Sequence, residues 1–110
     1  MPTRPDIIVL LVVASIVASG ARAAPASDCA AEAAALDRDQ SDLPKLEFAS
    51  PADRPPYCIT LETNMAFALR VKAHVAHCPQ SDYAQKLSEW DKTRAAYGKL
   101  FSQYRCKRTL

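Results

Sequence analysis

The chain has 110 residues and a formal net charge of +2, a length that leaves room for one domain only. Without its first 23 residues the chain is close to neutral, so net charge gives no support to a nucleic-acid partner. Only two glycines are present, whereas phosphate-binding loops of the Walker and Rossmann types need several. Phosphate-binding sites of the Walker and Rossmann types are therefore excluded.

The N-terminal segment has the features of an export signal. Arg4 precedes an uncharged apolar run over Ile7–Val17, and Ala21–Ala23 has the Ala-x-Ala pattern that signal peptidase accepts. The apolar run is too short to span a hydrocarbon core of about 30 Å comfortably, although an uncleaved anchor is the alternative. We expect a signal peptide over residues 1–23, with cleavage after Ala23 or Ala24.

The cysteines indicate the compartment in which the mature chain works. All four lie after the expected cleavage site, at Cys29, Cys58, Cys78 and Cys106. An even number of cysteines in a short exported chain implies a disulfide framework, which forms in an oxidising compartment. We therefore expect a disulfide-stapled domain over residues 24–110, in the bacterial periplasm or outside the cell, with no stable membrane insertion after cleavage.

The first expected helix runs from about Ser27 to Asp42. Ser27 can cap it, and its alanine-rich sequence favours helix. Residues 28–47 are acidic, whereas residues 86–108, near the end of the chain, are basic. The simplest explanation is that the first and last helices lie side by side with complementary charge.

A proline-rich connector follows the first helix. We expect this segment, which includes Pro55 and Pro56, to be extended rather than regular helix. Leu46 and Phe48 are expected to pack onto the helices.

The second expected helix runs from about Tyr57 to His77 and stops before Pro79. It is apolar over most of its circumference, so it should lie between the other two helices. Its narrow polar sector contains Arg70, His74 and His77, which we expect to be exposed. These three residues are the candidate binding face, because together they could form a cationic patch.

The third expected helix runs from about Ser81 to Arg105. A single stripe of side chains recurs along it at helical spacing, aromatic at all but two positions: Tyr83, Leu87, Trp90, Arg94, Tyr97, Phe101 and Tyr104. Such a stripe is usually core, because a small bundle needs large side chains to fill it. Stacking of these rings on an apolar ligand is the alternative.

Helix length restricts the disulfide pairing. Cys58 and Cys78 lie near opposite ends of the second helix, about 30 Å apart, whereas a disulfide needs Cα atoms within about 7 Å. Cys78 and Cys106 flank the third helix and are farther apart still. The pairing that remains is Cys29–Cys78 with Cys58–Cys106. It fits an all-α, up-down-up bundle of three helices.

The two histidines are candidate metal ligands, because imidazoles at positions i and i+3 of a helix can share an ion. The spacing is not that of a His-Glu-x-x-His motif, and a disulfide-bonded Cys78 is no thiolate ligand. We therefore expect no metal ion and no other cofactor.

The function expected from these features is that of a small, non-enzymatic binding protein. Its partner is expected to be another envelope or extracellular protein, in an accessory, inhibitory or immunity-like role. Two alternatives stay open. One is a carrier of a small apolar ligand, which needs a cavity between the aromatic stripe and the second helix. The other is a metal-binding or enzymatic role that uses His74 and His77.

Overall fold

The computed structural model describes residues 25–110, so the expected signal peptide and its cleavage site lie outside the described residues. The described part contains three α-helices, α2 (Ala26–Ser41), α3 (Arg54–His77) and α4 (Leu87–Gln103), and no strand. Two 3-10 turns, η1 (Leu46–Phe48) and η2 (Asp82–Lys86), lie in the connections. The prediction of an all-helical fold with three helices is confirmed for residues 25–110.

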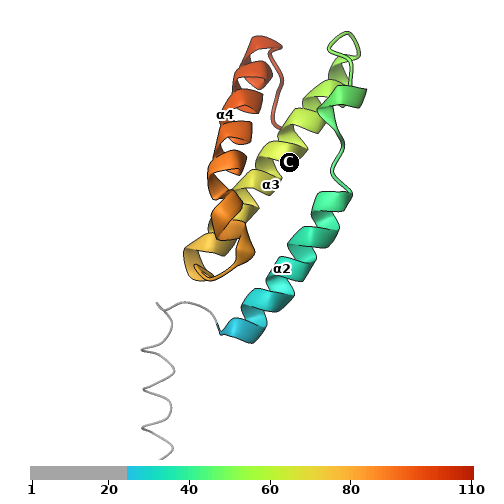
Figure 1. Cartoon of the computed structure of the whole chain (residues 1–110). Helices are drawn as coiled ribbons and strands as arrows, with labels where there is room; N and C mark the ends of the chain where they lie inside the picture. Colours follow the sequence, from blue (N-terminus) through green and yellow to red (C-terminus); the bar gives the residue numbers. More distant parts are fainter. Residues whose placement is uncertain (1–24) are drawn as a thin grey trace, which may run out of the picture.

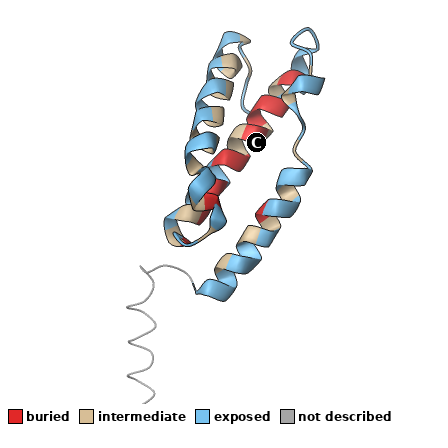
Figure 2. Cartoon of the chain, in the orientation of Figure 1, coloured by how far each residue is buried: buried red, intermediate tan, exposed pale blue. Residues whose placement is uncertain are grey.

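Helix α3 is the centre of the structure. The chain runs along α2, returns along α3 and turns again into α4, and both outer helices pack on α3 (Figure 1). Buried residues follow α3, whereas α2 and α4 are mostly exposed or half-buried (Figure 2). Leu36 is the one buried residue of α2, and it joins Phe67, Val71 and Tyr83 in the core.

The aromatic stripe of α4 packs against α3. The rings of Trp90 and Phe67 have centroids 4.9 Å apart, and Tyr104 meets Tyr57 edge to face at 5.1 Å. Gly98 lies between these points, and a Cβ there would lie 3.8 Å from the sulfur of Met65, an ordinary van der Waals distance, so the packing does not require glycine at this position. The rings thus fill the helix interface at these places, as a core stripe does.

Two disulfides staple opposite ends of the bundle. Cys29 is bonded to Cys78, with Cα atoms 5.8 Å apart, and Cys58 is bonded to Cys106, with Cα atoms 5.5 Å apart. These are the two pairs that the helix lengths leave possible. The first bridge holds the start of α2 against the end of α3, and the second holds the start of α3 against the end of α4.

The connector between α2 and α3 differs from the expectation. Helix α3 begins at Arg54, and Pro55 and Pro56 lie inside its first turn. The first N–H groups of a helix have no hydrogen-bond partner within it. Proline, which has no N–H, therefore costs no helical hydrogen bond at these positions. The expectation that Phe48 packs onto the bundle is wrong, since its side chain is 82% exposed; Leu46 is half-buried.

The third helix is shorter than expected. Its first residues form the 3-10 turn η2, and α4 ends at Gln103. Arg105 then adopts a left-handed conformation with φ 54°. The N–H of Arg105 bonds to the carbonyl of Ser102, and the N–H of Cys106 bonds to that of Phe101. This is the Schellman arrangement, and it turns Cys106 back toward α3.

Replacing Arg105 with glycine is expected to stabilise the oxidised protein by about 1 kcal/mol. Glycine adopts a positive φ without the steric cost that a Cβ imposes. The free energy of unfolding, measured in urea, tests this. Ser102→Gly is the matched control: it puts glycine inside the last turn of the helix and should lower the free energy of unfolding by about 0.5 kcal/mol. A loss of stability in both variants would contradict the account of this helix end.

Candidate functional site

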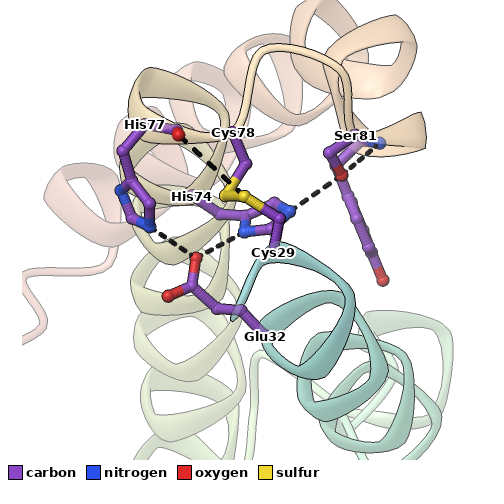
Figure 3. Close-up of a disulfide and its surroundings, with 7 residues drawn as sticks. Cys29, Glu32, His74, His77, Cys78 and Ser81 are labelled. Atoms are coloured by element: carbon purple, nitrogen blue, oxygen red, sulfur yellow. Dashed lines mark hydrogen bonds and ion pairs between the residues drawn. A yellow bond between two sulfur atoms is a disulfide. The ribbon is translucent and has the colours of Figure 1, made fainter. Parts of the chain in front are cut away.

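A carboxylate of α2 lies between two histidines of α3 (Figure 3). Oε1 of Glu32 is 2.5 Å from Nδ1 of His74 and 2.8 Å from Nε2 of His77. His74 is only 1% exposed, whereas the side chains of Glu32 and His77 are 44% and 42% exposed. We call these three residues the Glu–His cluster. One side of the cluster is fixed in the core, and the other side is open to solvent.

The far side of the His74 ring is held by Ser81. Nε2 of His74 is 2.8 Å from Oγ of Ser81, which also accepts the backbone N–H of Tyr83 at 3.2 Å. Both ring nitrogens of His74 therefore have partners, one from α2 and one from the turn after α3. These two partners fix the orientation of the ring.

The histidines keep Glu32 charged. The hydrogen bond from His74 lowers the pKa of the Glu32 carboxyl below its ordinary value; partial burial opposes this effect, and the bond from His77 adds to it. Glu32 is therefore a carboxylate at neutral pH. A negative charge thus lies at the mouth of the cluster.

The Cys29–Cys78 disulfide lies directly beside the cluster (Figure 3). Cys78 follows His77 in the chain, and Cys29 lies about one helical turn before Glu32. The carbonyl oxygen of His77 is 4.0 Å from the sulfur of Cys29. This bridge brings the start of α2 to the end of α3, so it sets the distance between Glu32 and the two histidines.

The candidate binding face predicted from the sequence is only partly open to solvent: the side chains of Arg70 and His77 are about half-exposed, whereas that of His74 is not. His74 is buried, so the expectation that it is exposed is wrong. Arg70, on the same side of α3, forms an ion pair with Asp39 at 2.9 Å. The physical reason is the antiparallel packing of α2, which places its carboxylates over the polar sector of α3.

The same packing corrects the expected pairing of the acidic and basic segments. Within residues 25–110, the ion pairs of α2 join Asp39 to Arg70 and Glu32 to the two histidines, and none joins α2 to α4. The outer helices have no extended interface with each other. The basic residues of the last segment therefore do not neutralise the acidic residues of α2.

A cleft opens next to the Cys29–Cys78 bridge, with a volume of about 680 Å³. We call it the disulfide cleft. It lies between the first half of α2 and the segment after α3, and its lining combines small apolar side chains with polar ones: Ala26, Cys29, Ala30, Ala33, Asp37, His77, Cys78, Pro79, Gln80, Ser81, Asp82, Tyr83 and Lys86.

Tyr83 forms part of the cleft wall and holds its two sides together. Its hydroxyl donates to Asp37 at 2.5 Å and to the side-chain oxygen of Gln40 at 3.2 Å. Burial raises the pKa of Tyr83, and the hydrogen bond to Asp37 raises it further. The hydroxyl therefore stays protonated and acts as a donor between η2 and α2.

A second carboxylate holds the end of the chain. Glu62, on α3, is buried and accepts the backbone N–H groups of Thr109 and Leu110 as well as the Thr109 hydroxyl. The bond from the Thr109 hydroxyl is the largest influence that lowers the pKa of Glu62. The last residues thus return along α3 instead of extending into solvent (Figure 1).

The sequence singled out His74 and His77 but not their partner Glu32. The signal that could have found Glu32 is the disulfide pairing itself. Once Cys29 is joined to Cys78, residues one turn after the first and one turn before the second must lie opposite each other. No comparable signal pointed to Glu62, because its partners are backbone groups.

None of the described helices is long and apolar enough to cross a membrane. No family model, curated protein or solved structure matches the chain.

Proposed function

We propose that the mature chain is an exported, non-enzymatic binding protein whose partner is another envelope or extracellular protein. The disulfide cleft is the observation that carries this proposal. Its volume of about 680 Å³ falls within the range of roughly 300–1,000 Å³ that is usual for ligand sites.

The compartment is supported by the cross-links. Two disulfides in a small domain are typical of an oxidising environment, where such bonds persist. The Ala-x-Ala pattern at Ala21–Ala23 and the apolar run before it suit export by cleavage after Ala23 or Ala24. Binding in the periplasm or outside the cell follows from these two features together.

The chemistry of the cleft fits a short peptide segment. Ala30 and Ala33 form a smooth apolar wall beside the disulfide, against which one apolar side chain of the partner can pack. Asp37 and Asp82 outnumber Lys86 in the lining, which favours a basic or hydrogen-bond-donating group next to it. The hydroxyl of Tyr83 is protonated and bonded to Asp37, so it offers no base to a ligand in the cleft.

Filling the cleft should weaken partner binding. Ala30 is exposed and lines the cleft, so Ala30→Trp places an indole in the space that the partner needs without disturbing the core. We expect the dissociation constant of the partner to rise at least about tenfold, which corresponds to about 1.4 kcal/mol. The oxidised mature domain is used to capture the partner from its own envelope fraction, and affinity is then measured by calorimetry with the purified partner.

Ala31→Trp is the matched control, because Ala31 is exposed on α2 next to Ala30 but does not line the cleft. It should leave both capture and affinity unchanged. Equal capture by the two tryptophan variants, or no specific capture by the unaltered domain, would contradict the proposal.

A further inference from the structure

We infer that the Glu–His cluster is a binding site for one divalent transition-metal ion, and that Zn²⁺ fits its donors best. This site does not depend on the proposed partner in the disulfide cleft. The inference rests on the geometry of Glu32, His74 and His77, whose donor atoms converge on one point (Figure 3).

The donor set is that of a known type of zinc site. Two imidazoles and one carboxylate bind Zn²⁺ and leave a fourth position open for water or another ligand. Nδ1 of His74, Nε2 of His77 and a carboxylate oxygen of Glu32 all lie within 4.8 Å of one another. The sulfur of Cys78 lies in the same group, but it is part of a disulfide and is not a thiolate ligand.

The distances between the Glu32 oxygen and the two histidine nitrogens are close to those of a zinc site. A tetrahedral Zn²⁺ with bonds of about 2.0–2.1 Å holds its donor atoms roughly 3.3 Å apart. The Glu32 oxygen now lies 2.5 Å and 2.8 Å from the two histidine nitrogens. Binding therefore replaces the protons shared by these groups and moves the Glu32 oxygen away from each nitrogen by less than about 1 Å. The half-exposed side chains of Glu32 and His77 can make this movement while His74 stays fixed.

The convergence on a single oxygen also favours a metal site. A ring nitrogen of each histidine contacts the same oxygen, Oε1 of Glu32. The two nitrogens and the oxygen therefore form one compact group, which a single ion can bridge once the shared protons have left.

The surroundings support the ligands. Oγ of Ser81 meets the far nitrogen of His74 at 2.8 Å, which is the outer contact that metal-binding histidines usually have. The Cys29–Cys78 bridge holds α2 against α3, so ligands from two helices are already in place before the ion arrives. Less conformational freedom is then lost on binding.

The test is a titration of the oxidised mature domain with Zn²⁺ alone, after treatment with a chelator, followed by calorimetry. We expect saturable binding of one ion per chain. Co²⁺ in its place should give the visible absorption of a tetrahedral site with nitrogen and oxygen donors. No saturable binding of Zn²⁺ would overturn the inference.

Two charge-removing substitutions on the same side of α2 separate a site from general attraction to acidic residues. Glu32→Gln should weaken Zn²⁺ binding more than tenfold, whereas Asp28→Asn, one turn earlier and exposed, should leave it unchanged. Equal weakening by both variants would contradict the site. His77→Ala provides an independent check, because His77 is half-exposed and its loss should spare the fold; retained binding in this variant also counts against the site.

Ser81 is expected to act as a positioning residue. Ser81→Ala should weaken Zn²⁺ binding about tenfold while the domain keeps both disulfides, since loss of such an outer contact usually costs 10- to 100-fold in affinity. Ala30→Trp should lose affinity for the partner but bind Zn²⁺ as the unaltered domain does. The Zn²⁺ titration and the partner-binding measurement therefore test the two proposals separately.

Discussion

Replacing Cys29 and Cys78 together with alanine is expected to lower the free energy of unfolding by about 4 kcal/mol. The bridge closes a loop whose ends are 49 residues apart in the sequence, and a cross-link of that span removes about this much entropy from the unfolded chain. The free energy of unfolding of a domain of this size is only a few kcal/mol. The variant should therefore be largely unfolded near 37 °C.

Urea unfolding of the purified variant, followed by circular dichroism, measures this effect. The second bridge provides the comparison, because Cys58 and Cys106 are 48 residues apart and their joint replacement should cost a similar amount. A loss below about 1 kcal/mol for either pair would show that the bridges follow folding and do not stabilise it.

Leu36→Ala is expected to cost about 3 kcal/mol. Leu36 is 2% exposed and is the one buried side chain of α2, packed with Phe67, Val71 and Tyr83. Removing it leaves a cavity where α2 meets the core, and such substitutions typically cost about 2–5 kcal/mol. No other side chain of α2 is buried, so none can replace the contacts that Leu36 makes with the core.

Leu110→Ala is the matched control for this prediction. It removes the same atoms from a side chain that is 76% exposed, and the backbone N–H that bonds to Glu62 is retained. We expect a change within about 0.5 kcal/mol. Similar losses in the two variants, measured by thermal unfolding, would mean that α2 is not anchored through Leu36.

The architecture could be predicted because it depends on lengths and periodicities. The apolar circumference of α3 placed it at the centre, and the rise of a helix kept Cys58 away from Cys78. The sequence also indicated that the aromatic stripe faces inward. These properties follow from local sequence, so no knowledge of the final packing was needed.

The site depends on how two helices are rotated against each other, which local sequence does not determine. His74 looks like an exposed polar residue on a helical wheel, yet it is buried because Glu32 and Ser81 satisfy both its nitrogens. The acidic residues of α2 looked like partners for the basic end of the chain. Their partners are on α3, since the Cys29–Cys78 bridge fixes α2 on the opposite flank.

The central position of α3 also has a dynamic consequence. The α3–α4 hairpin has an extensive interface of its own, whereas α2 meets α3 over a smaller one and has no extended interface with α4. Amide hydrogens of α2 should therefore exchange with solvent as one cooperative group, at a lower opening free energy than those of α3 and α4. The native state then includes a minor population in which the hairpin persists while α2 separates from it, joined to α3 only by the Cys29–Cys78 bridge at one end and by the chain connector at the other.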